Sequence, residues 1–289
     1  KKSNDAGLYY CKGLFHRYKG EPQLALQSFN NSRRDGVFGE ESINNMVEIY
    51  LNPDNEPLWA NSENDSIKLP SQSSLKAVGE LITELKEKGF NPRIVVYETY
   101  SMMITREKRA IESAIQKLQE LLNTRKDYVP AIVALATAKL LNKKAPDARN
   151  QLKIIAKKVY QPEYAEEYER AWLMLADIYV STSKYDLGEE LCAKSLKYNK
   201  SCGKAEEYFG LIKEKEQSYQ DAADHYEKAW KLASEKSASI GFRLSFNYLK
   251  AKRYIECIEV CKAVLKEFPE YPKIEKEILT KARHSLRAQ

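Results

Sequence analysis

The chain has 289 residues, of which 43% are hydrophobic and 30% charged, so it can bury a large core but is too long for one simple compact globule. Its net charge of +6 is modest and acidic residues alternate with basic ones, so we expect no nucleic-acid partner. No apolar run approaches the roughly 18 residues that a membrane span needs, so we expect a soluble chain without direct membrane insertion.

The N-terminal stretch "KKSNDAGLYY" has neither an initiator methionine nor the apolar region of a signal peptide. We therefore expect a fragment of a longer protein, truncated at its N-terminal end. The cysteines are few and irregularly spaced, which favours free thiols in a reducing compartment over a disulfide framework. They are Cys11, Cys192, Cys202, Cys257 and Cys261.

Prolines and glycines divide the chain into helices. Gly20 followed by Pro22 predicts the end of one helix and the first turn of the next. Further helix starts are predicted at Pro92, Pro130, Pro146 and Pro272. Residues 52–74 are rich in Asn, Pro, Ser and acidic groups and lack periodicity, so we expect a flexible insertion within the second repeat. A recognition role for this insertion stays open.

Residues 171–191, "AWLMLADIYVSTSKYDLGEEL", contain two apolar runs at helical spacing joined by a polar turn. Gly188 lies inside the second run, although a glycine in a helix interior costs about 1 kcal/mol relative to alanine. Ala176 is similarly small beside Trp172, where a larger side chain would bury more area. Both residues therefore predict a close approach between two helices.

The same small residue recurs along the whole chain at a spacing of about 34 residues. The series is Ala25, Gly79, Ala114, Ala148, Gly188, Ala222 and Cys257. Twelve residues earlier most repeats hold a second small residue, namely Gly13, Ala136, Ala176, Gly210 and Ser245, with Met102 as the exception. Four residues after the first series a larger residue follows, namely Phe29, Leu118, Leu152, Cys192, Tyr226 and Cys261, with Thr83 the weakest match.

This pattern is typical of the tetratricopeptide repeat, a helix-turn-helix unit. We predict an all-α fold, a right-handed superhelical solenoid of about seven tetratricopeptide repeats, occupying residues 1–289 as one array. Residues 272–289 are expected to form a C-terminal capping helix at the natural end of the chain, because an exposed last repeat needs a polar cover. No such cap precedes the first repeat.

Catalytic and metal-binding patterns are weak. Cys257 and Cys261 are four apart on one predicted helix but occupy packing positions, so buried structural thiols are favoured over a metal site. His16, His225 and His284 are isolated, and adjacent carboxylates such as Glu189 and Glu190 point about 100° apart on a helix. We therefore expect no enzyme active site and no cofactor, although a site completed by a partner chain stays open.

The remaining possibility is partner binding. In such a superhelix the first helix of each repeat lines the concave surface, at positions two before, one after and five after the Trp172 position. The candidate partner-binding residues are Arg170, Leu173, Asp177, Lys204, Glu207, Leu211, Ser239, Phe242 and Phe246. Leu173, Leu211, Phe242 and Phe246 favour packing against the neighbouring repeat over an apolar groove for a partner helix. These positions lack the Lys and Asn arrangement with which chaperone-binding repeats hold a terminal carboxylate.

Several stretches are more specific than the repeat requires: "RAWLMLADIY", "YNKSCGKAEEYFGLIKEKEQSYQDAADHYEKAW", "SIGFRLSFNYLKAKRY", "YPKIEKEILTKARHSLR" and "FGEESINNMVEIYLNPDNEP". They resemble the C-terminal portion of the large tetratricopeptide-repeat subunit of intraflagellar transport complex A. This resemblance implies a non-catalytic scaffold of the cytoplasm and the cilium or flagellum, including axoneme and basal body. It also implies a role in retrograde transport and membrane-cargo trafficking.

The implied partners are the other subunits of that complex, which combine propellers with helical repeats, and a small subunit that wraps across its neighbours. The alternative function is a peptide-binding adaptor of the chaperone-cofactor type, and an enzyme is the weakest candidate.

Overall fold

The computed structural model describes residues 5–52, 70–89 and 91–287, and these residues form helices joined by turns, with no β-strand among them. The all-α prediction is therefore confirmed. The chain divides into two compact units, Lys1–Lys157 (unit 1) and Lys158–Gln289 (unit 2). We describe each unit by itself.

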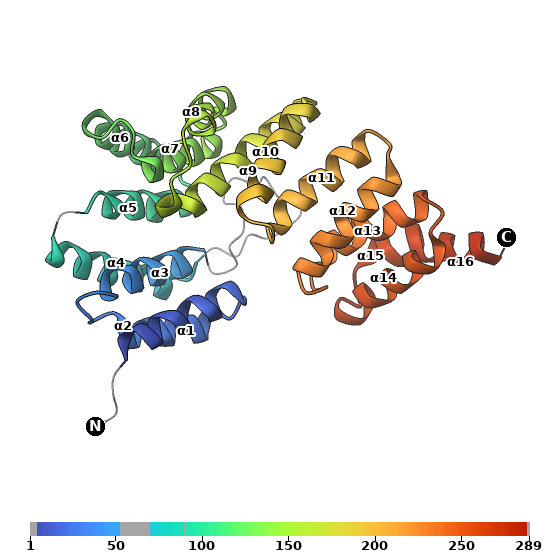
Figure 1. Cartoon of the computed structure of the whole chain (residues 1–289), viewed down its shortest axis with the longest axis horizontal. Coiled ribbons are helices and arrows are strands. Elements are labelled where there is room, and N and C mark those ends of the chain that lie inside the picture. The colour runs from blue at the N-terminus through green and yellow to red at the C-terminus, as the bar shows by residue number, and fades with distance from the viewer. Residues whose placement is uncertain (1–4, 53–69, 90, 288–289) are drawn as a thin grey trace. The chain divides into compact units, whose positions relative to one another are not determined.

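Unit 1 contains four helix pairs in its described part, and the second helix of each pair packs on the first helix of the next (Figure 1). Its helices are α1 (Ala6–Tyr18), α2 (Pro22–Ser32), α3 (Gly39–Leu51), α4 (Gln72–Lys88), α5 (Pro92–Ile104), α6 (Lys108–Thr124), α7 (Val129–Leu141) and α8 (Ala145–Lys157). A continuous apolar core follows these helices from α2 to α7. Short hairpin turns force the two helices of most pairs to run antiparallel.

Unit 2 contains three further pairs and a final helical segment within its described residues. Its elements are the 3-10 turn η1 (Pro162–Tyr164), α9 (Ala165–Ser181), α10 (Tyr185–Tyr198), α11 (Gly203–Lys215), α12 (Tyr219–Leu232), α13 (Ala238–Lys250), α14 (Tyr254–Glu267), α15 (Pro272–Ile274), the π-helical turn η2 (Glu275–Leu279) and α16 (Thr280–Arg287). Ile274, Ile278 and Ala282 of the final segment are buried in the same core as α12, α13 and α14.

Five of the described hairpins close with the same turn. The second residue after the first helix has a positive φ, and the N–H of the residue that follows it bonds a carbonyl five residues back, which satisfies a helix-end acceptor. The positive-φ residues are Gly20, Lys143, Ser183, Gln217 and Lys252. The bonds are Glu21 to His16, Lys144 to Lys139, Lys184 to Tyr179, Ser218 to Lys213 and Arg253 to Tyr248, at 2.8–2.9 Å. Only one of the five positions has the glycine that this conformation favours.

The residues expected at the repeat positions are buried. They are Gly13, Ala25, Phe29, Ala114, Ala136, Ala148, Trp172, Ala176, Gly188, Gly210, Ala222, Tyr226 and Cys257. Gly188 lies in α10 against its neighbours on both sides, because a Cβ added there would lie 3.2 Å from Val180 and 3.3 Å from Ile212. Close helix approach therefore explains the glycine at that position.

Residue sizes compensate across several helix pairs. A Cβ added to Gly13 would lie 2.5 Å from the Phe29 ring, and one added to Gly210 would lie 2.9 Å from the Tyr226 ring. In both pairs the two residues are sixteen positions apart in the sequence. Where the first helix has alanine instead, the residue sixteen positions later is smaller than an aromatic ring, as at Ala176 and Cys192. The two facing side chains therefore fill the space between the helices in different proportions in different repeats.

Gly79 is a correction to the predicted series. It is exposed, and a Cβ added there would meet nothing within 4 Å. The buried face of α4 is formed by Val78, Leu81, Ile82 and Leu85, which shifts the register of this helix by one residue. The preceding non-periodic stretch hid this register, because it removed the fixed spacing from the previous repeat.

Most of the expected insertion, residues 53–69, lies outside the described residues. The last three residues of its predicted range belong to the first turn of α4, which Ser71 caps by accepting a hydrogen bond from the Ser74 N–H at 3.1 Å. The expected C-terminal helix is present over residues 272–287, while 288–289 lie outside the described residues.

Candidate partner-binding surfaces

The predicted partner-binding residues of unit 2 lie on α9, α11 and α13, the first helices of its three pairs. We call the set Arg170, Leu173, Asp177, Lys204, Glu207, Leu211, Ser239, Phe242 and Phe246 the inner face. Leu173 is only 7% exposed and is a packing residue. Ser239 is exposed, and the other members are half-buried. Half-burial means that each of them packs on a neighbour and still presents part of its surface.

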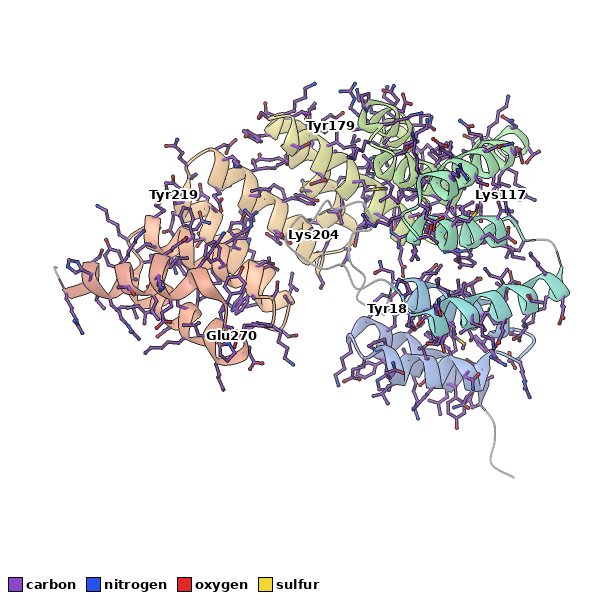
Figure 2. The ribbon with its side chains drawn as sticks, turned by 180° about the vertical axis from the view of Figure 1, so that it is seen from behind. Tyr18, Lys117, Tyr179, Lys204, Tyr219 and Glu270 are labelled. Atoms are coloured by element: carbon purple, nitrogen blue, oxygen red, sulfur yellow. The ribbon has the colours of Figure 1, made fainter. Side chains whose placement is uncertain are left out.

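Helices α9 and α11 are linked by polar contacts on this face. Tyr208 donates its hydroxyl to the Asp177 carboxylate, and burial raises the pKa of Asp177. Lys204, which Figure 2 labels on α11, makes an ion pair of 2.8 Å with Glu207. Its ammonium group also lies 5.6 Å from the centre of the Tyr208 ring. These side chains satisfy one another, so the surface that they offer is polar and preorganised.

Helices α11 and α13 are linked through Glu214. Asn247 donates its side-chain amide to Glu214 at 2.8 Å, and the Arg243 guanidinium lies 3.6 Å from the same carboxylate. Arg243 also donates to the Tyr226 hydroxyl at 3.3 Å. The sequence positions predicted for binding did not include these residues, although they occupy the same helices. Asn247 and Arg243 lie 33 and 29 residues from Glu214, so only the fold brings them together.

Phe242 and Phe246 supply the apolar part of the inner face. The Phe242 ring lies 6.0 Å from the Tyr271 ring, and the Phe246 ring lies 6.5 Å from Tyr219 in an edge-on arrangement. The Lys250 ammonium lies 5.6 Å from the centre of the Phe246 ring. Neither phenylalanine is fully covered by these contacts. Half-covered aromatic rings with nearby charge are typical of protein interfaces.

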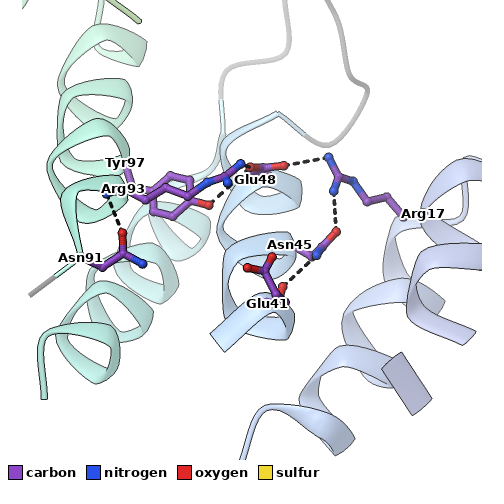
Figure 3. A network of polar contacts seen from close by, with 7 residues as sticks. All are labelled: Arg17, Glu41, Asn45, Glu48, Asn91, Arg93 and Tyr97. Atoms are coloured by element: carbon purple, nitrogen blue, oxygen red, sulfur yellow. Dashed lines mark hydrogen bonds and ion pairs between the residues drawn. The ribbon is translucent and has the colours of Figure 1, made fainter. Parts of the chain in front are cut away.

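Unit 1 has a different arrangement on its first helices, which we call the Glu48 cluster: Arg17, Asn45, Glu48, Arg93 and Tyr97 (Figure 3). The Glu48 carboxylate accepts hydrogen bonds from Arg17 at 2.8 Å, Arg93 at 3.2 Å and Tyr97 at 3.3 Å. Arg17 belongs to α1, Glu48 to α3, and the other two donors to α5. One carboxylate therefore links three successive helix pairs.

Asn45 extends the Glu48 cluster along α3. Its side-chain oxygen accepts from Arg17, and its amide donates to the Glu41 carbonyl at 2.8 Å. The side chains of Arg17 and Glu48 are 17% and 22% exposed, so their ion pair is partly shielded from water. Charge-assisted hydrogen bonds in such an environment are stronger than exposed ones. Sequence periodicity gives no signal for this cluster, because its hydrogen-bonded partners on different helices lie 28–49 residues apart.

His225 has a companion that its isolation in the sequence concealed. Its Nδ1–H donates to the Glu206 carboxylate at 2.6 Å, and its ring stacks on Phe209 with 4.9 Å between centres. His16 makes the equivalent contact with Glu21 at 2.7 Å. Each dyad joins the two helices of one pair. Both contacts therefore have a structural explanation within the repeat.

The cysteines are free thiols, of which Cys11 is exposed and the other four are buried. Burial raises the pKa of Cys192 to about 12, which keeps its thiol protonated and unreactive. The Cys257 thiol donates to the Ser245 carbonyl at 3.2 Å, so it bridges the two small repeat positions of the last pair. A hydrogen bond with Cys261, together with burial, raises the pKa of Cys257.

A search of the described ranges finds no cluster of three His, Cys, Asp or Glu side chains with the spacing of a metal site. In the same ranges no helix combines the length and the apolar character needed to cross a bilayer. The described residues form packed helix pairs with polar links along their first helices.

Comparison with known proteins places these features in a family. The family model described as the tetratricopeptide repeat protein 21 C-terminal ARM domain matches residues 77–283, and that of the TT21 fifth ARM repeats domain matches residues 1–51. Tetratricopeptide repeat protein 21B of Mus musculus is 45% identical over 98% of this chain, and the tetratricopeptide repeat protein 21 homolog of Caenorhabditis elegans is 32% identical over the same share.

The chain spans 22% of the length of these relatives. Among solved structures, the crystal structure of the APC/C hetero-tetramer Cut9-Hcn1 superimposes with a TM-score of 0.62 at 13% identity, covering 98% of this chain and 50% of that one. At this identity the likeness shows the helical-repeat fold alone. The sequence matches carry the further conclusion that the chain belongs to the tetratricopeptide repeat protein 21 family.

Proposed function

We propose that the chain is a non-catalytic scaffold segment of intraflagellar transport complex A that acts in retrograde ciliary transport and ciliary membrane-cargo trafficking. The observation that carries the proposal is membership of the tetratricopeptide repeat protein 21 family over almost the whole chain. Its site of action is then the cytoplasm and the cilium, at the basal body and along the axoneme. Helix-pair repeats suit this role because they present long surfaces built from many helices.

Within this proposal the inner face of unit 2 contacts another subunit of the complex. Phe242 and Phe246 offer half-covered aromatic surface, and Lys204 and Glu207 lie on the preceding first helix. An apolar centre with charged groups beside it is the usual composition of a protein interface. The partners that fit are propeller and helical-repeat subunits and the small wrapping subunit.

The test uses the full-length protein that contains this chain, carrying Phe242→Ala and Phe246→Ala together. We expect it to fold and to lose one subunit of the complex on co-purification from ciliary extract. The matched control is Phe268→Ala, because Phe268 is a similarly exposed phenylalanine at the end of α14, away from the first helices. A protein that never enters cilia, or whose removal leaves the complex intact, would contradict the proposed function.

A further inference from the structure

Positive charge is concentrated in one short stretch of the chain. Residues 139–158 contain seven Lys and Arg residues and a single acidic residue, Asp147, so this stretch alone accounts for the net charge of +6 of the whole chain. In the remainder acidic and basic residues are balanced. A local excess of this size is unlike the interleaved charges of the other repeats and creates a positive potential over one helix.

The charge lies on α8 and on the turn before it, where Lys143, Lys144, Arg149, Lys153 and Lys157 form what we call the basic face (Figure 1, α8). Arg149, Lys153 and Lys157 are spaced four residues apart, which places them in one row along the helix. Like charges at this spacing repel and destabilise a helix. The fold alone therefore gives no reason for the row.

No ion pair neutralises the cations of the basic face. Among the described residues none of its five side chains makes an ion pair, and the buried Nε of Arg149 has no hydrogen-bond partner. Some exposed lysines elsewhere are paired, as Lys86 is with Glu98 at 2.7 Å and Lys231 with Glu227 at 2.6 Å.

The basic face also has an exposed apolar centre. Ile154 is 46% exposed between Lys153 and Lys157, whereas Leu152 and Ile155 of the same helix are fully buried. The exposed side of α8 therefore combines a row of cations with one aliphatic side chain.

We propose that the basic face binds an acidic segment of a protein partner, with carboxylates facing Arg149, Lys153 and Lys157 and an apolar side chain against Ile154. Successive cations in the row are about one helical turn apart, roughly 5–6 Å, so carboxylates on successive turns of a partner helix match them. The bound carboxylates relieve the repulsion within the row. This surface lies on a second helix of unit 1 and shares no residue with the inner face.

A protein segment fits the basic face better than a lipid or a nucleic acid. Helices that lie on membranes present several large apolar or aromatic side chains, whereas the exposed side of α8 presents Ile154 alone. Single-stranded nucleic acids stack on aromatic rings, and α8 contains no aromatic residue.

The test measures binding of the whole 289-residue chain to a labelled 12-residue peptide of Glu and Leu at helical spacing, with both termini blocked. We expect saturable binding at low ionic strength that weakens at least tenfold when the salt is raised severalfold. A peptide with Gln in place of Glu is expected not to bind. In Lys153→Glu/Lys157→Glu the affinity is expected to fall at least tenfold, and Lys153→Gln/Lys157→Gln is expected to give a smaller loss.

The matched control is Lys262→Glu/Lys266→Glu, because these two exposed lysines have the same spacing on α14 but lie among Glu256, Glu259 and Glu267. This control is expected to bind the peptide like the unsubstituted chain, and circular dichroism checks that all variants are folded. Equal binding of the Glu and Gln peptides, or equal loss in the control, would overturn the proposal. So would tighter binding to phosphatidylserine vesicles or to single-stranded DNA than to the peptide.

Discussion

The two units link their first helices in different ways. In unit 1 the donors from α1 and α5 converge on one carboxylate, Glu48, which belongs to the helix between them. In unit 2 the links are pairwise, with Asp177 joining α9 to α11 and Glu214 joining α11 to α13. A shared carboxylate makes three helices depend on one side chain. With separate carboxylates, the loss of one side chain affects only the contact between two helices.

The difference also affects the exposed surface. The charged members of the Glu48 cluster form ion pairs with one another. The inner face of unit 2 keeps half-covered aromatic rings beside its polar links. The comparison indicates that the Glu48 cluster serves cohesion between helix pairs, whereas the inner face combines such links with half-covered aromatic rings.

Overpacking the size-compensated contacts is the largest expected perturbation in either unit. Gly13→Ala in unit 1 and Gly210→Ala in unit 2 each place a methyl group within 3 Å of an aromatic ring, and we expect each to reduce the free energy of unfolding by about 2–3 kcal/mol. Urea unfolding followed by circular dichroism measures both losses. A Tyr226→Leu change in the Gly210→Ala background should recover part of the loss.

Gly79→Ala is the control for these substitutions. Gly79 is exposed in α4 with open space around it, so the added methyl group should stabilise the helix by about 0.5–1 kcal/mol. A destabilisation equal to that of Gly13→Ala would show that the packing described for α4 is wrong.

Removing the shared carboxylate is the next largest effect and tests the comparison directly. Glu48→Gln removes the carboxylate that the partly shielded Arg17 and Arg93 share, and we expect the free energy of unfolding to fall by about 2 kcal/mol. Glu214→Gln should cost about 1 kcal/mol, because its cationic partner lies at 3.6 Å. Hydrogen exchange measured by mass spectrometry should rise in α1, α3 and α5 for the first variant, and in α11 and α13 alone for the second. If either variant raised hydrogen exchange equally in all helices of both units, the proposed difference between the shared and the pairwise carboxylates would be wrong.

Glycine at the left-handed turn positions is expected to stabilise both units by a smaller amount. Ser183→Gly in unit 2 and Lys143→Gly in unit 1 remove the strain of a side chain at φ 57° and 58°, and each should add about 0.5–1 kcal/mol of stability. Gly20→Ala should have the opposite sign. Thermal unfolding of the three variants against the unsubstituted chain gives the comparison, and a loss of stability in Ser183→Gly would refute the turn assignment.

The smallest expected effect concerns pH and unit 2 alone. Burial raises the pKa of Asp177, so its stabilising contribution is complete below the pKa of the unfolded chain and is lost as pH rises through the folded value. Asp177→Asn removes the ionisable group, and with it the loss of stability at high pH, while its amide oxygen can still accept the hydrogen bond from Tyr208. The variant should therefore gain stability relative to the unsubstituted chain at pH 7.5 and gain less at pH 4. Parallel unfolding curves at the two pH values would argue against the raised pKa.

The paired helices and most of the packed positions follow from the sequence, because a contact between two helices of one hairpin recurs at fixed spacing. Gly188 is an example: its neighbours Val180 and Ile212 lie within one repeat length of it. The prediction was wrong at Gly79, where the non-periodic stretch before α4 removed the reference spacing. It also missed Gly241, whose added Cβ would lie 2.4 Å from Val264 and 2.7 Å from the Trp230 ring.

The polar links were beyond sequence reasoning for a different reason. Glu48 meets Arg17 and Tyr97 across 31 and 49 residues, from one hairpin to the next. Such contacts depend on how one hairpin is rotated against the next, and no periodic pattern encodes that rotation. The inner-face residues could be chosen from their helix positions, but their partners could not.

Size compensation at positions sixteen residues apart has an evolutionary consequence. If the combined volume of the two side chains is what each repeat must preserve, the individual residues are free to drift as long as they drift together. Homologous chains should then show linked exchanges at Gly210 and Tyr226, with a growing first residue accompanied by a shrinking second one. Pairs of positions that change together, more than positions that never change, should therefore identify the contacts between the two helices of each hairpin.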